Sequence, residues 1–451
     1  MKTISRSVTA LKWAIALVTL LQGSAYAEEE PNLLDIANPD ATKAETIKLE
    51  ERLNRVEQEL QALESLQVSA TTRLSGQSTF VVGANGFHGS ATSLVDSSRQ
   101  LYGATSFNYD TRLTLSTSFT GSDLLHMRLR AGNFGPQRNS FGGGGPSVLS
   151  QLEVAFEERS GADRLSLNRL YYQFPLGDFT FTLGPRVEQD AMLAIWPSLY
   201  PSESILDLMT FGGAIGANNL NLGTGAGLWW RQGGFAISAL YVAANGESSG
   251  PLNGGRLDGG LFNAQSGSTT TLQVGYRQDQ WAIAAIYSYL QNGAGVIPYA
   301  TNFTLNSFAQ AGYTSAAGIG GYWQPRQSGW IPSISAGWGI NRTTYTNNDS
   351  SAGLARISQS WSLGFLWSDA FAVGNTLGTA LGQAVYATSV YGGEHPNDNN
   401  LIWELWYQIQ LTDQLNITPA LFYLYRPLGA ATPSSESFNQ LGGLIKLSLR
   451  F

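Results

Sequence analysis

The sequence predicts an all-β transmembrane barrel of sixteen antiparallel strands, with short periplasmic turns and long outer loops, preceded by a short coiled-coil helix. Three observations support this prediction. Apolar and polar residues alternate from Thr72 to Phe451, as they do in strands with one face toward lipid and the other toward water. Only 13% of the residues are charged, against roughly 25% in soluble proteins. The connections between the predicted strands are short and long in turn.

The first 27 residues have the organisation of a secretory signal peptide. A basic stretch is followed by the apolar run Trp13–Leu21 and by the small-x-small motif Ala25-Tyr26-Ala27. The apolar run is far shorter than the ~20 residues of a spanning helix. We therefore interpret residues 1–27 as a signal peptide cleaved after Ala27, in preference to a membrane anchor.

The chain contains no cysteine, which excludes disulfides and thiolate metal sites.

Two further segments precede the predicted barrel, which spans residues 72–451. Residues 28–44 are polar and contain two prolines, so we expect a flexible leader. Residues 45–67 have a helical rhythm, and their apolar positions follow the 4-3-4-3 spacing of a coiled coil; these are Leu49, Leu53, Val56, Leu60 and Leu63. This helix is interpreted as a periplasmic stalk that joins three copies of the chain, or alternatively as an amphipathic helix on the barrel rim.

The period-two alternation defines sixteen predicted strands, an even number as single-chain bacterial barrels require. They cover residues 72–83, 104–119, 122–133, 163–174, 178–186, 224–232, 235–245, 269–278, 281–291, 315–324, 330–341, 357–368, 376–388, 401–411, 414–425 and 438–451. The strand at 163–174 changes phase, because Leu165 and Leu167 share one parity and Leu170 and Tyr172 the other. A bulge near Asn168 restores the pattern and turns Arg169 inward.

Five arginines fall on the predicted inner face of neighbouring strands. They are Arg112, Arg128, Arg130, Arg169 and Arg186. Counting back from the turn at Gly121 places Arg112 nearly opposite Arg130, and like charges so paired reduce stability. The functional interpretation is a cationic wall that orders water and attracts anions or polar solutes at a constriction. The alternative is that these arginines only neutralise nearby acids such as Asp110.

The longest predicted loop, residues 187–223, carries acids in its first half. These are Glu188, Asp190, Glu203 and Asp207, interspersed with Trp196, Pro197, Tyr200 and Pro201. A loop of this length with aromatic and proline residues is expected to fold into the barrel. Its acids would then face the arginine wall and create a transverse field across a narrow pore constriction. The alternative is an outer lid that packs on its own aromatic residues.

The tryptophans and tyrosines of the predicted strands mostly have outward parity and lie near strand ends, as in the interfacial belts of membrane proteins. Trp229 and Trp406 are exceptions with inward parity.

The chain contains only three histidines, widely separated in the sequence, which argues against an enzyme with Ser-His chemistry and against a metal site. A formal net charge of −7 argues against nucleic-acid binding. No cofactor is expected.

Two segments resemble a known family. The segment from Asn168 to Arg186, NRLYYQFPLGDFTFTLGPR, is similar to the central motif of carbohydrate-selective (OprB-type) porins, and closest to their cyanobacterial iron-uptake-porin-like branch. The segment from Glu404 to Pro419, ELWYQIQLTDQLNITP, is also similar. The resemblance implies a sixteen-stranded outer-membrane porin. Two features depart from the branch: the leader is too short for the usual surface-layer-homology domain, and ALFYLYRP follows Pro419 where the family has Asp and Gln.

These patterns together predict a function in the cell outer membrane. We expect passive diffusion of small hydrophilic solutes and inorganic ions through a water-filled barrel. Two alternatives remain open, a carbohydrate-selective porin and a structural tether between outer membrane and cell wall. The expected partners are outer-membrane lipids, the permeating solutes or ions, and two further copies of the chain in a homotrimer.

Overall fold

The computed structural model describes residues 67–69, 71–158, 161–201, 204–250, 259–263, 266–292, 297–347, 351–393, 395–433 and 435–451. The chain divides into two units, residues 1–65 and 66–451, and all described residues belong to the second. The predicted signal peptide and leader therefore lie outside the described residues and remain predictions. The same holds for the predicted coiled-coil helix except at its last residue, Gln67, which belongs to a short strand instead of a helix.

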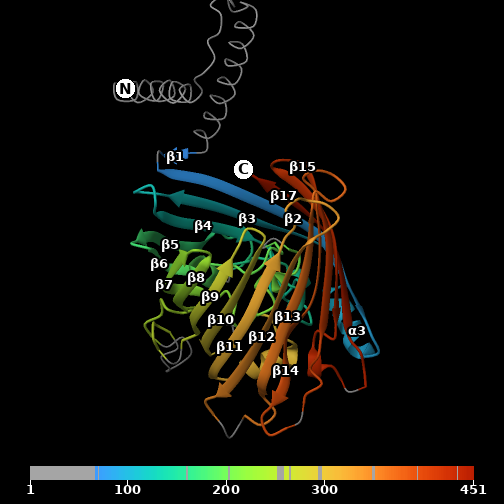
Figure 1. Cartoon of the computed structure of the whole chain (residues 1–451). Coiled ribbons are helices and arrows are strands. Elements are labelled where there is room, and N and C mark those ends of the chain that lie inside the picture. Colours follow the sequence, from blue (N-terminus) through green and yellow to red (C-terminus); the bar gives the residue numbers. More distant parts are fainter. Residues whose placement is uncertain are drawn as a thin grey trace, which may run out of the picture. The chain divides into compact units, whose positions relative to one another are not determined.

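Sixteen described strands form a closed antiparallel barrel (Figure 1). Each strand from β2 to β17 pairs with its neighbours in sequence, and β17 returns to β2, where Lys446 lies opposite Val81. The strands are β2 (Thr72–His88), β3 (Ser106–Thr117), β4 (Leu124–Gly132), β5 (Ser166–Leu176), β6 (Phe179–Glu188), β7 (Leu222–Gln232), β8 (Phe235–Ala243), β9 (Ser268–Arg277), β10 (Trp281–Gln291), β11 (Gly312–Trp323), β12 (Ser333–Tyr345), β13 (Ala355–Ser368), β14 (Thr376–Val390), β15 (Leu401–Thr412), β16 (Leu415–Tyr425) and β17 (Asn439–Arg450). The predicted fold class is confirmed. An additional short strand, β1 (Gln67–Ser69), pairs with the beginning of β2.

The two rims of the barrel differ in their connections. Gly233 and Gly234 alone join β7 to β8, and both have positive φ angles, 58° and 88°, which glycine adopts without steric cost. The opposite rim carries the longer connections, and these contain the helices α3 (Thr92–Tyr102) and α4 (Asn302–Phe308). The described residues also include five 3₁₀ helices outside the strands: η2 (Ser140–Gly142), η3 (Val148–Ser150), η4 (Gln189–Met192), η5 (Asp207–Phe211) and η6 (Gly429–Ala431). Among the described helices, none has the length and apolar character to cross a membrane.

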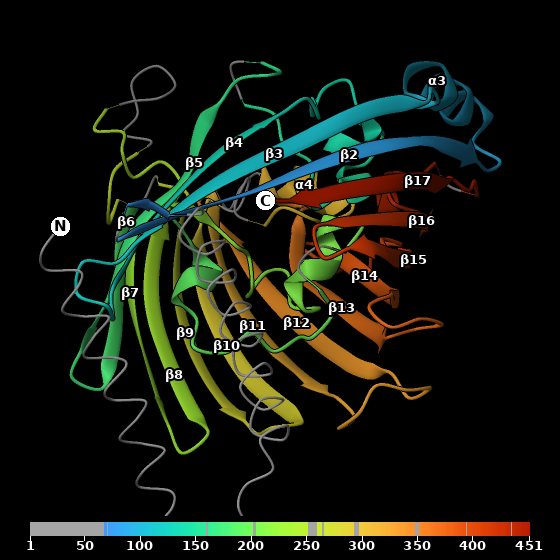
Figure 2. The same ribbon diagram turned by 90° about the horizontal axis from the view of Figure 1, so that it is seen from above.

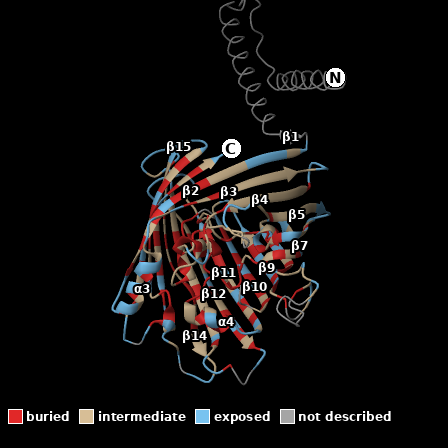
Figure 3. Ribbon diagram, turned by 180° about the vertical axis from the view of Figure 1, so that it is seen from behind, coloured by how far each residue is buried: buried red, intermediate tan, exposed pale blue. Residues whose placement is uncertain are grey.

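Alternation along the strands separates an apolar outer surface from an inner one. In β2, Val82 is 45% exposed while its neighbour Val81 is fully buried. In β17, Ile445 is 55% exposed and Leu444 is only 5% exposed. Figure 3 shows the same change from buried to exposed along many strands. Exposed valine, isoleucine and leucine around a closed barrel form a surface suited to lipid.

The predicted bulge in the fifth described strand is present. Arg128 on β4 lies opposite Arg169 on β5, while the next residue, Leu129, lies opposite Leu167. Asn168 is therefore the extra residue, and the register shifts by one at this point. The shift lets Arg169 line the interior, while Leu167 and Leu170 on either side of the bulge are not part of that lining.

The connection between β6 and β7, residues 189–221, folds into the barrel (Figure 2). We call it the inward loop. Its backbone bonds to side chains of the barrel wall, since Ala194 N donates to Ser238 Oγ on β8 at 2.7 Å and Leu199 N to Ser335 Oγ on β12 at 2.8 Å. The largest buried apolar cluster of the described residues includes Leu206 and Met209 of this loop together with wall residues such as Leu240 and Ile286. The expectation that this loop turns inward is thus correct for its described residues.

Candidate functional site

The inward loop leaves one side of the barrel interior open as a cavity of about 1320 Å³. Its walls include side chains of β2 to β6, and its lining reaches both rims of the barrel. Gly76 and Phe451 lie at the rim with short turns, where they are joined by backbone hydrogen bonds. Glu157 and Glu247 lie on connections of the opposite rim. A single cavity therefore touches both ends of the barrel.

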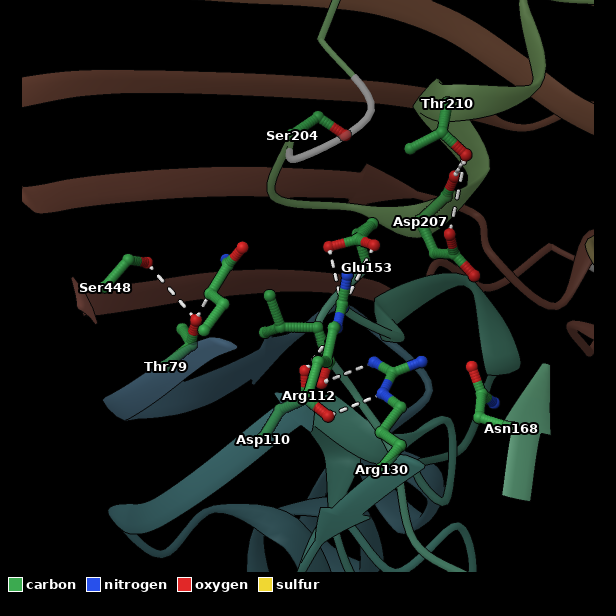
Figure 4. Close-up of polar contacts among 12 residues, drawn as sticks. Thr79, Asp110, Arg112, Arg130, Glu153, Asn168, Ser204, Asp207, Thr210 and Ser448 are labelled. Atoms are coloured by element: carbon green, nitrogen blue, oxygen red, sulfur yellow. Dashed lines mark hydrogen bonds and ion pairs between the residues drawn. The ribbon is translucent and has the colours of Figure 1, made fainter. Parts of the chain in front are cut away.

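Asp110 on β3 holds two arginines of the predicted wall together (Figure 4). Its two carboxylate oxygens accept hydrogen bonds from Arg112 Nε at 2.6 Å and from Arg130 Nε at 2.5 Å. Arg112 and Arg130 lie directly opposite each other across β3 and β4, as the count from Gly121 indicated. Asp110 is 1% exposed and lies beneath the guanidinium groups instead of lining the cavity. Asp110 thus neutralises part of the charge of Arg112 and Arg130, as in the alternative interpretation of the arginine wall given from the sequence.

A second pairing joins the inner wall to the start of the inward loop. Arg169 forms an ion pair with Glu188, and Asp190 follows Glu188 at the cavity surface. Arg128 and Arg186 also line the cavity, and neither forms an ion pair with an acid of the described residues. The Nε atom of Arg128 is buried and has no hydrogen-bond partner in this part of the chain. The acids and the wall arginines are thus brought together, with two cations left without an acidic partner.

Asp207 extends the acidic side of the cavity from η5. Its carboxylate accepts a hydrogen bond from the hydroxyl of Tyr299, which lies in the connection between β10 and β11. Burial inside the barrel raises the pKa of Asp207 to about 7, the hydrogen bond from Tyr299 opposes this shift, and the charge of Glu153 adds to it. Asp207 therefore changes its charge near neutral pH. Glu203, the remaining predicted acid, lies outside the described residues.

The pKa of Asp190 is also raised above the ordinary value of an aspartate carboxyl group. The surrounding protein and the neighbouring charge of Glu188 raise the pKa of Asp190, while Arg169 lowers it. Its side chain is exposed to the cavity, whereas that of Asp207 is partly buried. Two acids with raised pKa values therefore line the same cavity.

The sequence did not single out Glu153, which completes the cluster around Asp110. Arg112 Nη2 contacts both oxygens of Glu153, at 3.1 and 3.3 Å. Glu153 reaches this position because a second connection, residues 133–165, also enters the barrel; Glu153 N donates to Ile205 O at 3.1 Å, and a β-bridge joins Leu152 to Leu206. The available signal was a single acid within the otherwise apolar stretch Leu152–Phe156.

The aromatic residues with inward parity contact the inward loop. Trp406 is 5% exposed, and its Nε1 donates to the hydroxyl of Tyr200 at 2.8 Å. Trp229 packs against the buried cluster that contains Ile195. Both tryptophans thus support the loop. Other aromatic side chains line the cavity itself, namely Phe156, Trp196, Phe211 and Tyr299.

No metal-binding arrangement accompanies these residues. Within the described ranges, no group of three or more His, Cys, Asp or Glu side chains has a geometry suited to holding a metal ion. What the arrangement offers is a hydrated passage lined by guanidinium groups, carboxylates and aromatic rings. Such a lining acts on a solute by hydrogen bonding, by electrostatic attraction and by shape.

Comparisons with known proteins agree with this geometry. The OprB of Pseudomonas putida, in its high-pH structure, superposes with a TM-score of 0.53 at 12% identity, covering 84% of this chain and 94% of that one, which supports the fold. An uncharacterized protein of the cyanobacterium Nostoc sp. is 27% identical over 85% of this chain and 67% of its own length. One of Synechocystis sp. is 27% identical over 91% and 74%.

A family model, described as carbohydrate-selective porin, OprB family, matches residues 41–443. The match spans most of the barrel as well as the residues immediately before it, and it confirms the resemblance of the segments around Asn168 and Glu404. Family and fold together indicate a channel. The chain belongs to the carbohydrate-selective porin (OprB) family and is an outer-membrane porin.

Proposed function

We propose that the protein mediates passive diffusion of small hydrophilic solutes and inorganic ions through the cavity on the β2–β6 side of the barrel. The observation that carries this proposal is the lining of the cavity, which includes Gly76 and Phe451 at one rim and Glu157 and Glu247 at the other. A solute that enters at one rim meets the same hydrated space at the opposite rim. Steady diffusion requires no energy-coupling group along this path.

The narrow part of the path is proposed to lie where Glu188 and Asp190 approach the wall arginines. Arg169 is held by Glu188, and Arg128 and Arg186 supply cations nearby. Opposed charges at this point would orient dipolar solutes and reduce the permeability of apolar ones, because an apolar solute would displace ordered water without replacing its hydrogen bonds. We propose that the predicted arginines, with Glu188, Asp190 and Asp207, line this constriction together with Glu153, while Asp110 holds Arg112 and Arg130 from beneath.

A sugar-selective pore is the second candidate, and one observation favours it. Phe156, Trp196, Phe211 and Tyr299 line the same cavity as the charged groups. Aromatic faces beside charged hydrogen-bonding groups suit a solute with an apolar ring face and hydroxyl groups at its edge. The family is described as carbohydrate-selective, which points the same way.

The localisation is proposed in more detail from the sequence. Cleavage after Ala27 would release a mature chain whose short-turn rim faces the periplasm, as in other barrels of this kind. We further propose a homotrimer, because the coiled-coil spacing of residues 45–67 suits association of several copies. Cross-linking of the mature protein in native membranes tests this assembly, and a monomeric product at all cross-linker concentrations would refute it.

The experiment that tests the pore combines conductance with matched variants. We expect the wild-type protein in planar bilayers to form open channels, and Glu188→Gln with Asp190→Asn to change conductance and to reduce cation preference. The control variant, Asp96→Asn with Glu436→Gln, removes the same charge from exposed positions that do not line the cavity. Unchanged conductance and ion selectivity in the first variant would contradict the proposed constriction, and absence of any channel would contradict the pore.

Liposome swelling separates the two candidate pores. Vesicles that contain the protein are placed in isotonic sugar, chloride, phosphate or iron-salt solutions, and the swelling rates are compared. Similar rates for sugars and salts of the same size support general diffusion. Much faster swelling in sugar than in salts supports a carbohydrate-selective pore.

A further inference from the structure

A second recess, of about 710 Å³, lies at the short-turn rim and is separate from the lining of the main cavity. It is formed around the turn between β7 and β8 and the end of β9. Its charged lining consists of Arg231, Arg277 and Asp279, and its remaining walls include Ile195, Gly234 and Ala236. No residue of this recess was singled out by the sequence patterns or by the family match.

The strand register explains why the recess is open. Arg231 on β7 lies opposite Ala236 on β8, and Ala236 lies opposite Gly275 on β9. Arg277 lies two residues further along β9. Strands are about 4.8 Å apart and rise about 3.4 Å per residue, so the backbones at Arg231 and Arg277 are roughly 12 Å apart. The residues between them, Gly234 and Ala236, are too small to fill that space.

The two arginines differ in how they are held. Arg231 donates a hydrogen bond to the carbonyl oxygen of Ala194 in the inward loop, and its guanidinium group lies 4.6 Å from the ring centre of Trp229. Arg277 forms no ion pair within the described part of the chain. Arg231 is close enough to be affected by the positive charge of Arg277. Asp279 alone supplies negative charge to the lining, so the recess keeps a net positive charge.

We propose that this recess binds a tetrahedral oxyanion, either inorganic phosphate or the phosphoryl group of a phosphorylated solute. Two guanidinium groups on opposite sides of a small-residue floor match the several acceptor oxygens of such an anion, because each planar fork donates two parallel hydrogen bonds. A dianion also relieves the repulsion between the two cations. Arg231 is prearranged by Ala194 and Trp229, so only Arg277 must become ordered when the anion binds.

The site lies next to the inward loop, because Arg231 contacts Ala194 and Ile195 forms one wall. An anion held there would occupy the short-turn end of the barrel. If the proposed function and its periplasmic assignment of this rim are correct, the anion binds at the periplasmic exit and slows passage of other anions. The binding itself rests only on the recess, and can be measured without a conducting channel.

The test is equilibrium dialysis of the full mature protein in detergent against radiolabelled inorganic phosphate, with glucose 6-phosphate as competitor. We expect saturable phosphate binding, and about tenfold or greater weakening in Arg277→Gln, since a charged hydrogen-bonding partner is lost. Arg326→Gln is the matched control: Arg326 is a cation of the same rim that bonds to Gln280 and does not line the recess. Competition by glucose 6-phosphate at lower concentration than by free phosphate would identify the phosphorylated solute as the preferred source.

Three results would overturn the proposal: no saturable phosphate binding by the wild-type protein, equal binding by Arg277→Gln and wild type, or equal loss in Arg277→Gln and Arg326→Gln. Arg277 is exposed, so its substitution is not expected to disturb folding, and heat-modifiable migration on gels checks this for each variant. In bilayers, phosphate added at the short-turn side should reduce chloride current in the wild type more than in Arg277→Gln. Phosphate binding without conductance would preserve this site while contradicting the proposed pore.

Discussion

The inward loop is fastened to the barrel wall at Glu404, and removing that attachment should disturb the pore. Glu404 on β15 is fully buried. Its Oε1 accepts a hydrogen bond from the hydroxyl of Tyr200 at 2.6 Å, and its Oε2 accepts one from Leu206 N at 2.7 Å. Both carboxylate oxygens are therefore used as acceptors by residues of the same loop. Glu404→Gln replaces one acceptor oxygen with an NH₂ donor of nearly the same size.

The size of the effect follows from these two bonds. In Glu404→Gln the new NH₂ group must face either the Leu206 N–H or the Tyr200 hydroxyl, so one buried donor loses its acceptor. Losing a charge-assisted hydrogen bond and leaving its donor unsatisfied costs about 3 kcal/mol. A change of about 3 kcal/mol increases the population of states with the 200–206 segment undocked by roughly a hundredfold. The rest of the loop stays attached through other bonds, so the variant should fold.

Single-channel recording in planar bilayers measures this directly. We expect Glu404→Gln to show greater open-channel current noise and brief excursions to a different conductance. The matched control is Ser360→Ala, which removes the bonds from Ile215 N at 3.2 Å and to Gly213 O at 2.9 Å. These bonds are neutral and worth about 1 kcal/mol each, so the control should be quieter. Wild-type noise in Glu404→Gln, or greater noise in Ser360→Ala, would refute the assignment of Glu404 as the main attachment.

Two further predictions concern charge inside the barrel. Burial raises the pKa of Asp207 to about 7 in the folded protein, so folding favours the protonated carboxyl group. The contribution of Asp207 to the free energy of unfolding is therefore full at acid pH and falls as the pH rises toward 7. Cation preference should therefore decrease on acidification from pH 8 to pH 6, and Asp207→Asn should reduce that change in reversal-potential measurements; a variant that titrates like the wild type would contradict this role. Asp110→Asn leaves Arg112 and Arg130 without their shared carboxylate and should destabilise the barrel by about 3 kcal/mol, with a shift toward anion selectivity. Urea unfolding in lipid vesicles measures the change in stability. Unchanged unfolding would show that Glu153 alone compensates both arginines.

The parts of the fold that the sequence predicted are those decided by local alternation. The lipid-facing and interior positions of β3 follow from period two, and the turn at Gly121 then fixes Arg112 opposite Arg130. The bulge at Asn168 was also visible, because a change of parity within one strand has few structural causes. These features depend on neighbours within about twenty residues in sequence, for which the strand pattern carries enough information.

The contacts that complete the candidate site could not be read in this way, because they join segments far apart in sequence. Tyr200 and Glu404 are 204 residues apart, and the bond between Tyr299 and Asp207 spans 92 residues. The entry of the second connection, which places Glu153 beside Arg112, depends on a bridge between Leu152 and Leu206. No periodicity in the chain encodes such loop-to-loop pairings, since they depend on how two loops share the interior of a closed barrel.

The residue types on the inner wall of the barrel nevertheless differ between the part that contacts the inward loop and the part that lines the cavity. Several wall positions that bond to the backbone of the inward loop are serines, because a short hydroxyl side chain lets the loop approach the wall closely; these are Ser238, Ser335 and Ser360. Wall positions on β3 to β5 that the loop leaves uncovered carry the arginines. Arg231 also bonds to the loop, at Ala194 O, but it lies at the short-turn rim and does not line the hydrated passage. The change from serine to arginine around the barrel therefore marks where docking surface ends and hydrated passage begins.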